Sequence, residues 1–478
     1  MHHTIIRPGF DPATLRPRIL HIGFGAFARA HLMVYLQEGL NAAGGDFGVV
    51  ACRLNSGVEE LTALDAAGHR YLVAEVDGAT VTARELGVVI GTCHPGRDGI
   101  DALLDLIASE PMSVISLTIT EKGYCCRNGS LDLDHAGIRA DLENPQSPKT
   151  AIGVIVAGLE RRRGNGLSGL TVLSCDNQPD NGKLTRAAVL AFAHQRDGKL
   201  ADWIDANVTF PGTMVDRVVP ALDSEGAQLL KDINGGKDDP NGIVCEPFRQ
   251  WVIEDDFASA RPPYAEGGAM LTGDVHPFET MKLRMLNGSH TFLAMLGTLS
   301  GLETVDACMA DTVFRKATLQ LMLTEQRPTL PEIDGVDIEG YAEDLITRFA
   351  NPKLKHRTRQ IASDTSQKLP QRLLSAIADN LDAGRPWPLQ ALAVAGWMRF
   401  VKEAADAGEK LADPLSADLI ALAEKQDGES LIDALSGVET IFPADLRDAP
   451  GFRAGIIEAY NAIAENGARK AVEAVIEA

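Results

Sequence analysis

Residues 18 to 28 read Arg18-Ile19-Leu20-His21-Ile22-Gly23-Phe24-Gly25-Ala26-Phe27-Ala28. The first five form a short run typical of a buried strand, and a helical pattern through Leu32, Leu36 and Leu40 follows the last. Between them, Gly23-x-Gly25-x-x-Ala28 has the spacing of a loop that receives a dinucleotide pyrophosphate at a helix N-terminus. The first glycine permits a tight turn, the second lets backbone N–H groups approach phosphate, and the small third residue lets helix and strand pack closely. So short a pattern also occurs in simple turns, and its strand and helix context is what favours a dinucleotide site.

Strand and helix patterns alternate through the first half of the chain. Apolar, β-rich runs occur at residues 47–51, 113–119 and 170–174, with a helical stretch at 151–163. This alternation predicts an α/β fold with a mostly parallel sheet. From about Met281 onward, long helical patterns dominate, for example at 390–403 and 452–476. We therefore expect two domains, an α/β domain at residues 1–275 and a mainly α-helical domain at residues 276–478.

Composition and charge exclude several classes of function. The chain has 478 residues, of which 45% are hydrophobic and 23% charged, as in an ordinary globular protein. Its formal net charge of −21 repels nucleic acid and anionic membranes, so we expect neither as a partner. No run is long and apolar enough for a signal peptide or membrane span, which favours a cytoplasmic protein. The sequence does not fix its oligomeric state, which we expect to be a monomer or a small homo-oligomer. No metal site is predicted, because zinc-site spacing is missing among the seven cysteines, which are Cys52, Cys93, Cys125, Cys126, Cys175, Cys245 and Cys308.

The second strand leaves the choice between NAD and NADP open. NAD-binding units usually place an acidic residue at the end of this strand, where it binds the ribose diol. Here the chain reads Cys52-Arg53-Leu54-Asn55. Arg53 could face the 2′-phosphate of NADP, or it could be a solvated surface charge. We therefore expect NAD without excluding NADP.

The densest polar cluster in apolar surroundings lies at residues 281–290. At 100° per residue, an α-helix would place Asn287 about 140° and His290 about 80° around the axis from Lys282, so that all three border one cleft. A lysine buried beside apolar side chains has a lowered pKa, which makes it a usable acid or base. Oxidation of an alcohol needs such a base and donors for the developing oxyanion, and Lys282 and Asn287 suit these roles. The alternative is an ordinary amphipathic helix, against which Gly288 argues, since glycine costs about 1 kcal/mol in a helix interior.

Two other stretches carry polar residues next to strands. Residues 174–182 begin Ser174-Cys175-Asp176-Asn177 and follow a strand, where α/β sheets present ligand-binding residues, although such a sequence is more commonly a plain turn. Residues 214–220 place Asp216 and Arg217 within an apolar run. Such a pair is more often structural than catalytic.

Taken together, these stretches resemble the polyol-specific long-chain dehydrogenase/reductase family, which includes mannitol dehydrogenases and uronate reductases. The resemblance runs from about residue 18 to beyond 460. It is carried by the glycine loop, by Val215-Asp216-Arg217-Val218-Val219-Pro220, by Cys245-Glu246-Pro247-Phe248, and by Lys282-x4-Asn287-x2-His290. The resemblance implies a zinc-independent, NAD-dependent oxidoreductase with a Rossmann-type N-terminal domain and a mainly α-helical C-terminal domain.

The resemblance also implies roles for particular residues. Lys282 is expected to be the acid/base, Asn177 and Asn287 to hold the oxyanion, and His290 and Asp216 to position the substrate and tune the lysine. The residues expected to bind the cofactor are Gly23, Gly25, Ala26, Phe27, Arg29, Thr120 and Glu121. A cofactor-binding protein without catalytic activity would keep the glycine loop but would not need Lys282, Asn287 and His290 together.

Within the family, three stretches look like the uronate-reducing branch: residues 120–125 with Lys122, residues 287–290 with Gly288, and residues 366–372. The expected substrates are therefore D-mannonate and D-fructuronate, with D-mannitol/D-fructose or D-arabinitol/D-xylulose as the alternative. A sugar acid is an anion, and a protein of net charge −21 needs local cations to hold one. The candidates are Lys122, Arg357, Arg359, Lys368 and Arg372, of which at least two are expected to be ordinary surface charges.

Overall fold

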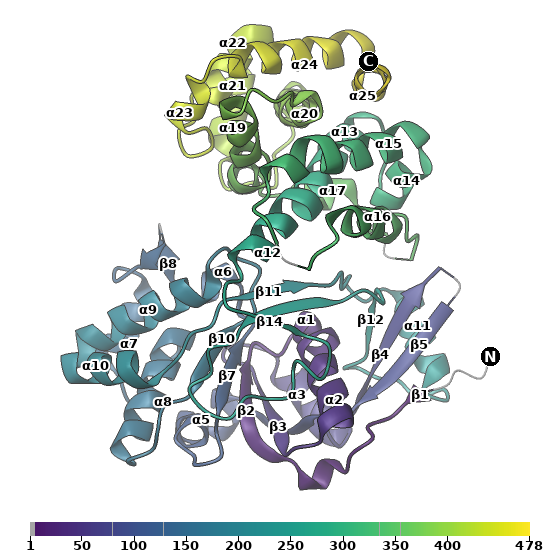
Figure 1. Cartoon of the computed structure of the whole chain (residues 1–478). Coiled ribbons are helices and arrows are strands. Elements are labelled where there is room, and N and C mark those ends of the chain that lie inside the picture. The colour runs from purple at the N-terminus through teal and green to yellow at the C-terminus, as the bar shows by residue number, and fades with distance from the viewer. Residues whose placement is uncertain (1–4, 79, 128, 334, 354) are drawn as a thin grey trace. The chain divides into compact units, whose positions relative to one another are not determined.

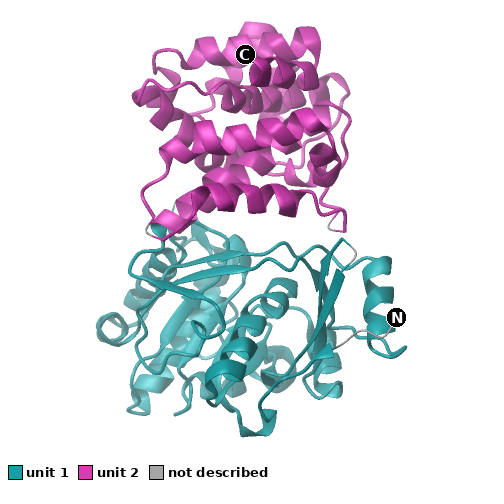
Figure 2. Cartoon of the chain, turned by 45° about the vertical axis from the view of Figure 1, so that its right-hand side comes forward, with its two compact units in different colours: residues 1–276 teal, residues 277–478 magenta. Residues whose placement is uncertain are grey.

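The computed structural model describes residues 5–78, 80–127, 129–333, 335–353 and 355–478. The chain divides into two compact units, Met1–His276 and Pro277–Ala478, drawn in teal and magenta in Figure 2. The first unit mixes strands and helices, and the second is built from helices, as Figure 1 shows. The predicted α/β class, with a Rossmann-type domain followed by a mainly helical one, is confirmed.

The central sheet of the first unit is all parallel. Among the described residues it has five strands in the spatial order β6-β3-β2-β7-β10. Numbered along the chain within this sheet, that order is 3-2-1-4-5, as in a dinucleotide-binding sheet. Its strands are β2 (Arg16–Ile22), β3 (Phe47–Cys52), β6 (Val89–Cys93), β7 (Val114–Leu117) and β10 (Thr171–Ser174). Ile22 is the register partner of both Cys52 and Leu117, and Leu117 pairs with Ser174, so these strand ends form one edge. In such sheets, ligands bind beyond this carboxyl edge.

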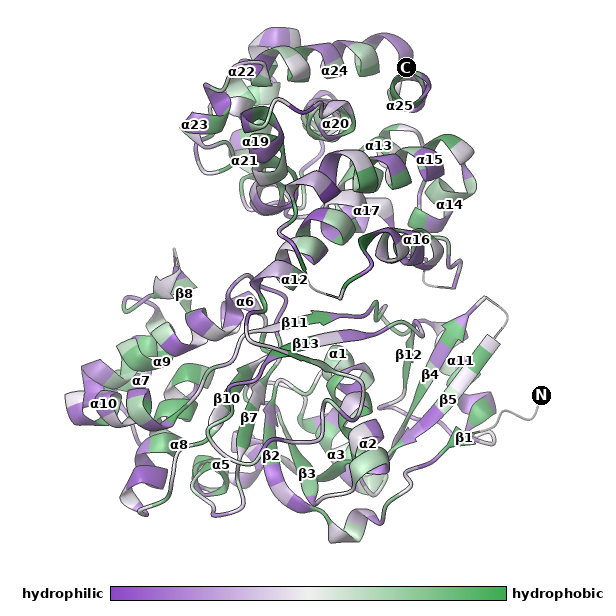
Figure 3. Cartoon of the chain, viewed as in Figure 1, coloured by the Kyte–Doolittle hydropathy of each residue, from purple (hydrophilic) through white to green (hydrophobic). Residues whose placement is uncertain are grey.

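Both faces of the central sheet are buried, which explains why its strands read as continuous apolar runs. Leu20 and Ile22 of β2 pack into a core with α5, α8, α9 and α10, whereas Ile19 packs into a second core with α2 and α3. Figure 3 shows hydrophobic colour along β3 and β7 and hydrophilic colour on the outer helix α10. The helices of this unit are α1 (Ala26–Ala30), α2 (Leu32–Ala43), α3 (Val58–Ala66), α4 (Pro95–Asp98), α5 (Ile100–Ile107), α6 (Thr120–Gly123), α7 (Ala136–Glu143), α8 (Ala151–Gly164), α9 (Asn181–Arg196), α10 (Gly198–Asn207) and α11 (Ser224–Ile233), with the short η1 (Pro12–Thr14).

Smaller sheets flank the central one, and the sequence patterns did not predict them. Strand β4 pairs antiparallel with β5 in the order β1-β5-β4-β12, a second sheet has the order β11-β13-β14, and β8 pairs with β9. Their bounds are β1 (Ile5–Ile6), β4 (Tyr71–Asp77), β5 (Thr80–Leu86), β8 (Cys126–Arg127), β9 (Ser130–Leu131), β11 (Thr213–Asp216), β12 (Ile243–Cys245), β13 (Gln250–Glu254) and β14 (Met270–Thr272). The buried ion pair of Arg217 with Glu75, 2.6 Å apart, joins the loop after β11 to β4.

The second unit is organised around two helices that are buried on all sides for most of their length. Residues 289–297 of α13 are all buried, as are residues 389–398 of α20. The two helices pack closely, because a Cβ on Gly396 would lie 2.8 Å from Leu296 Cδ2. The helices of this unit are α12 (His276–Met281), which begins at the last residue of the first unit, α13 (Ser289–Leu299), α14 (Val305–Ala310), α15 (Thr312–Gln320), α16 (Ile338–Phe349), α17 (Thr358–Ile361), α18 (Thr365–Leu369), α19 (Ser375–Asp382), α20 (Pro388–Asp406), α21 (Ser416–Ala423), α22 (Gly428–Ser436), α23 (Ala444–Arg447), α24 (Phe452–Asn466) and α25 (Ala468–Glu477).

Three stretches of the second unit form π-helical turns, in which hydrogen bonds join residues five apart. They are η2 (Lys282–Gly288), η3 (Leu321–Gln326) and η5 (Pro370–Leu374), and the short 3₁₀ turn η4 (Arg327–Thr329) follows η3. π-Helical turns are rare and occur frequently at functional sites. Within the described residues, no helix is long and apolar enough to cross a membrane.

Candidate active site

The glycine loop joins the carboxyl ends of three strands. Gly23 has φ +95°, and a Cβ there would overlap the main chain of Thr118, so only glycine fits without a shift. The backbone N–H groups of Gly23 and Phe24 donate to Cys52 O at the end of β3. Apart from chain neighbours, the only described heavy atom within 4 Å of where a Cβ on Gly25 would stand is Gly23 O, at 3.6 Å. The loop therefore has the open backbone that a pyrophosphate group needs.

A buried histidine fixes this loop to the end of β7. His21 Nδ1 lies 2.8 Å from Ser116 Oγ, and Nε2 lies 3.0 Å from Thr118 Oγ1. Thr118 Oγ1 in turn donates to Gly23 O at 2.7 Å. Burial lowers the pKa of His21 to about 3, so the ring stays neutral and acts as a structural link between the two strands.

The loop after β7 is held by the carboxylate of Asp176. Its two oxygens accept the backbone N–H groups of Ile119 at 2.9 Å and Thr120 at 2.8 Å, and Tyr124 Oη donates at 2.7 Å. Tyr124 Oη also lies 2.5 Å from Ser174 Oγ. Thr120 has φ +62°, a left-handed conformation that costs a non-glycine residue about 1 kcal/mol or more. Burial raises the pKa of Asp176, an effect that the accepted hydrogen bonds partly oppose.

Asn181 ties this loop to β11. Its Nδ2 donates to Asp176 O at 3.1 Å and Thr213 O at 2.8 Å, while its Oδ1 accepts the Thr213 N–H at 3.0 Å. Strand β11 ends at the buried Asp216, and Asn177 stands exposed on the loop after β10. Arg217 is buried and donates to Glu246 O and Glu75 Oε1, so its role is structural.

The other residues predicted to bind the cofactor have different surroundings. Ala26 and Phe27 begin the five-residue helix α1, and the Phe27 ring stacks on His31 with centroids 4.8 Å apart. The guanidinium of Arg29 donates to Gly25 O at 3.3 Å and Asn241 O at 2.7 Å, so it supports the glycine loop from behind. Glu121 is exposed next to Thr120 in α6. Their roles in cofactor binding stay predictions.

The predicted α-helical geometry of the lysine-bearing segment is wrong, because residues 282–288 form the π-helical turn η2. Hydrogen bonds between residues five apart bring Asn287 close to the face that carries Lys282. Both side chains are buried, and Asn287 Nδ2 has no hydrogen-bond partner among the residues that the structure describes. A buried amide N–H donor of this kind needs an acceptor, and a substrate oxygen would supply one. Thr291 Oγ1 donates to Asn287 O at 3.0 Å and fixes the turn to α13.

His290 stands one turn further on in a cationic environment. Its ring packs on Phe349, with centroids 4.3 Å apart, and lies edge-on to His356 at 5.3 Å. Burial lowers the pKa of His290 well below its usual value, and the nearby His356, Arg372 and Arg348 lower it further. The ring is therefore neutral, and a negative group beside it would be stabilised by the positive charges of Arg372 and Arg348.

The structure separates the predicted substrate cations of the second unit into two groups. Arg372, in η5, acts electrostatically on His290 and points Nη1 at Thr291 Oγ1, 3.4 Å away. Burial lowers the pKa of His356, and the nearby Lys368 lowers it further. Lys368 Nζ donates to the carbonyl oxygens of Ile361 and Ser363. By contrast, Arg357 and Arg359 are exposed at the start of α17, and Arg359 pairs with Glu409 at 3.5 Å. Lys122, in the first unit, is exposed in α6.

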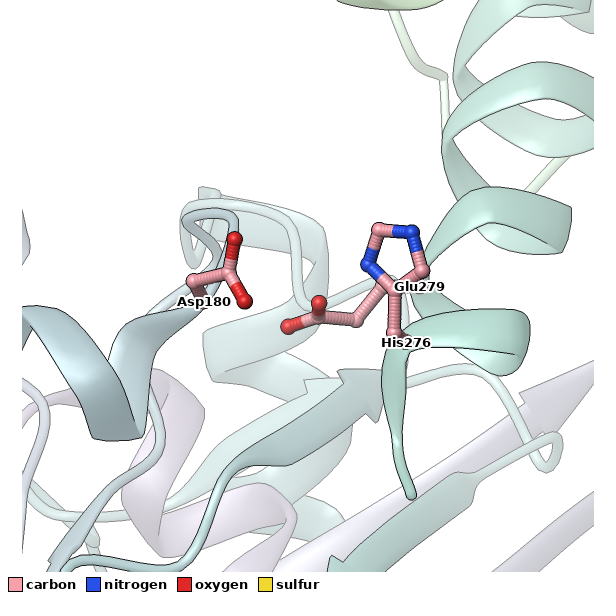
Figure 4. Close-up of side chains that lie close together, drawn as sticks. All are labelled: Asp180, His276 and Glu279. Carbon is pink, nitrogen blue, oxygen red and sulfur yellow. The ribbon is translucent and has the colours of Figure 1, made fainter.

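One group of side chains has the donor set of a metal site. Among the described residues, Asp180, His276 and Glu279 offer ligand atoms within 4.8 Å of one another (Figure 4). Asp180 also accepts a hydrogen bond from Lys183 Nζ at 2.7 Å, so its charge is already balanced. The predicted lysine mechanism does not use this group.

Comparison with known proteins gives the family. A model of the mannitol dehydrogenase Rossmann domain matches residues 17–266, and a model of the mannitol dehydrogenase C-terminal domain matches residues 274–464. The chain belongs to the mannitol dehydrogenase family. The family resemblance predicted from the sequence is thus confirmed, and with it the assignment to a family of oxidoreductases that act on CH–OH groups.

Relatives in this family act on more than one kind of substrate. The D-mannonate oxidoreductase of Escherichia coli strain K12 is 44% identical over 98% of both chains. A mannitol 2-dehydrogenase of Phaeosphaeria nodorum is 35% identical over 97% of this chain and 82% of its own. The solved mannitol 2-dehydrogenase of Pseudomonas fluorescens, a ternary complex with NAD and D-mannitol, is 34% identical, covers 99% of this chain and 97% of its own, and has a TM-score of 0.85.

The motifs of this family do not reveal every residue near the site. The sequence analysis missed Arg348 and His356, which flank His290, and the clamp formed by Asp176 and Tyr124. A signal for Arg348 does exist, because in α16 it follows Leu345 by three positions and so falls on the buried face with Tyr341 and Phe349. A charged residue on the apolar face of a helix is unusual, which makes Arg348 a candidate functional residue.

Proposed function

We propose that this protein is an NAD-dependent oxidoreductase that interconverts D-mannonate and D-fructuronate without a metal ion. The observation that carries the sugar-acid assignment is the positive charge of Arg348 and Arg372, which acts on the buried His290. The identity to a D-mannonate oxidoreductase over nearly the whole chain supports it.

The cofactor in this proposal is NAD. The open backbone at Gly25 and the constraint at Gly23 suit a pyrophosphate group at the start of α1. Arg53, the residue that could receive a 2′-phosphate, already has a partner in Glu60, 3.5 Å away. When bound, the nicotinamide supplies or accepts the hydride.

Lys282 performs the proton transfer in this proposal. Reduction of the fructuronate ketone places a hydride on carbon and a proton on oxygen, so that NADH and one proton are consumed and D-mannonate and NAD⁺ are formed. Lys282 Nζ donates that proton, and in the reverse direction it accepts the hydroxyl proton of D-mannonate. A preorganised donor lowers the cost of charge that develops on the oxygen, and the Asn287 amide is such a donor. Asn177 and Asp216 of the first unit keep the roles that the family resemblance gives them.

The cations near His290 suit the substrate carboxylate. A charge-assisted hydrogen bond contributes about 1.5–3 kcal/mol, more than a neutral one. In a chain of net charge −21, such a local concentration of positive charge is needed to overcome the repulsion of an anion by the whole protein. Arg372 and Lys368 are the proposed carboxylate-binding residues of the second unit, whereas the exposed Arg357 and Arg359 are left out. A role for Lys122, which is also exposed, rests on the family resemblance alone.

Steady-state assays with both cofactors test the proposal. D-fructuronate, D-tagaturonate, D-fructose and D-xylulose serve as substrates for reduction, and D-mannonate, D-mannitol and D-arabinitol for oxidation. We expect kcat/KM for the D-fructuronate/D-mannonate pair to exceed that of every other pair. A tenfold preference for D-mannitol would instead support the second candidate, a mannitol 2-dehydrogenase, which the 34–35% identity to such enzymes favours.

A further inference from the structure

Gly288, the last residue of the lysine-bearing turn, lies against the main chain of Arg372. A Cβ on Gly288 would stand 2.8 Å from Arg372 O and 2.6 Å from Gln326 Nε2. Real Cβ atoms essentially never come this close to another heavy atom, so any side chain at position 288 must displace these neighbours. From this crowding we infer that Gly288 determines substrate specificity, because its missing side chain lets Arg372 approach the catalytic turn and reach the charged end of the substrate. The inference rests on the proposed function.

One of the two neighbours of Gly288, Gln326, belongs to a segment that is held in place. Gln326 ends η3, and its Oε1 accepts a hydrogen bond from the buried Ser289 Oγ at 3.3 Å. The preceding residue, Glu325, is buried and accepts the backbone N–H groups of Leu389 and Gln390, both at 2.8 Å, which fixes η3 to the start of α20. Even where the Gln326 side chain gives way, a methyl group at position 288 still overlaps a main-chain atom, Arg372 O, so it pushes on the main chain of Arg372.

A shift of the Arg372 main chain moves its guanidinium relative to His290. Arg372 Nη1 lies 3.4 Å from Thr291 Oγ1, and Thr291 follows His290 directly in α13. Charge-assisted hydrogen bonds depend strongly on distance and angle, so a displacement of a few tenths of an ångström weakens a contact with a carboxylate. A neutral polyol has no carboxylate, and its hydroxyl groups need only the lysine turn.

A double-mutant cycle on the full-length enzyme tests the inference. The variants are Gly288→Ala, Arg372→Ala and the pair, assayed with D-fructuronate and NADH. If Gly288 acts through Arg372, we expect Gly288→Ala to lower kcat/KM about 10- to 100-fold, mostly through KM, in the wild type and by less than about threefold in the Arg372→Ala background. Equal losses in both backgrounds would refute the inference.

Two further variants separate this effect from a general loss of structure. Gly396→Ala is the matched control, since it also introduces a crowded methyl group, 2.8 Å from Leu296 Cδ2, into a buried helix of the same unit. We expect it to lower the melting temperature without changing the KM for D-fructuronate.

A second variant serves if Gly288→Ala does not fold. Gly288→Ala combined with Gln326→Ala removes one of the two clashes and leaves the one with Arg372 O. This variant should still show the raised KM for D-fructuronate, and an unchanged KM would contradict the inference.

The outcome for the proposed function is read separately, from the wild-type enzyme. A wild type without activity on D-fructuronate refutes the proposed function. A wild type that is active on D-fructuronate, but whose Gly288→Ala variant is as active as the Gly396→Ala variant, refutes the inference alone.

Discussion

The carboxylate of Asp176 accepts the backbone N–H of Thr120 at 2.8 Å and so holds the loop after β7 to the loop after β10. The second oxygen accepts Ile119 N–H and Tyr124 Oη, so both oxygens have donors. Thr120 keeps its left-handed backbone at φ +62° only because such contacts outweigh the strain. Asp176 is therefore a positioning residue for the segment that carries Thr120, Glu121 and Lys122.

The Asp176→Asn variant tests this role. An amide has one acceptor oxygen in place of two and brings its own N–H toward the donors, so we expect a loss of about 1–3 kcal/mol in unfolding free energy. We also expect a higher KM for NADH with a smaller change in kcat, because the loop loses its position and the lysine turn does not. Denaturant unfolding and steady-state kinetics measure both. Tyr124→Phe removes a single donor and should show the same pattern at smaller size; an unchanged KM in Asp176→Asn would rule out the positioning role.

A second prediction concerns the pH dependence of stability. Burial raises the pKa of Glu325 from 4.5 to about 7 in the folded protein. Between these values the folded state binds more protons than the unfolded state, so this group lowers stability as pH rises, by roughly 1.4 kcal/mol per pH unit within the window. Glu325→Gln cannot titrate. We expect the stability of the wild type relative to this variant to fall between pH 5 and 7 and to stay constant above pH 8. A difference that does not vary with pH would show that Glu325 titrates normally.

Much of the first unit follows from local sequence. The strands at β2, β3, β7 and β10 are recognisable because both faces of a parallel sheet are buried, which gives continuous apolar runs. The helix predicted after the glycine loop is divided at His31, whose Nε2 lies 2.9 Å from Gln250 O, a residue 219 positions away. The pairing of β4 with β5 also escaped prediction, because β5 is largely polar. Both differences come from contacts that no local pattern contains.

The candidate site divides in the same way. Lys282, Asn287 and His290 could be found because they share one short segment with unusual polarity. The π-helical form of that segment could not be predicted, since the hydrophobic spacing of seven residues fits either helix and the packing of Gly288 against Arg372 and Gln326 is a tertiary contact. For Arg359 the sequence suggested a role that the structure does not support. This residue lies close in sequence to Lys368 and was predicted to bind the substrate, but it forms an exposed ion pair with Glu409.

A third prediction tests the lysine mechanism. Lys282→Ala should lower kcat by a factor of about 10²–10⁴, the usual contribution of general acid–base catalysis, with little change in NADH affinity. Stopped-flow fluorescence of NADH binding and steady-state turnover give the two readouts. Prolonged dialysis against EDTA should leave the wild type fully active. The Asp180→Ala variant removes one carboxylate of the Asp180, His276 and Glu279 group, and its activity should likewise not depend on added metal. Loss of activity with EDTA and recovery with zinc would contradict a metal-free mechanism.

The last prediction uses two arginines that the sequence alone treats as equivalent. Arg372 acts on the buried His290, whereas Arg359 is 72% exposed and pairs with Glu409. An exposed ion pair contributes about 0–1 kcal/mol, so Arg359→Ala should leave the KM for D-fructuronate within about twofold of the wild type. Arg372→Ala should raise that KM about 10- to 100-fold, because it removes a charge-assisted contact, and should change the KM for D-fructose by less than about threefold.

A further variant, Arg372→Lys, separates charge from packing, because it keeps the charge but not the planar guanidinium. A KM for D-fructuronate between those of the wild type and Arg372→Ala would assign the effect to charge. If Arg372→Ala changes the KM for D-fructuronate by no more than about twofold, as expected for Arg359→Ala, Arg372 does not bind the substrate carboxylate.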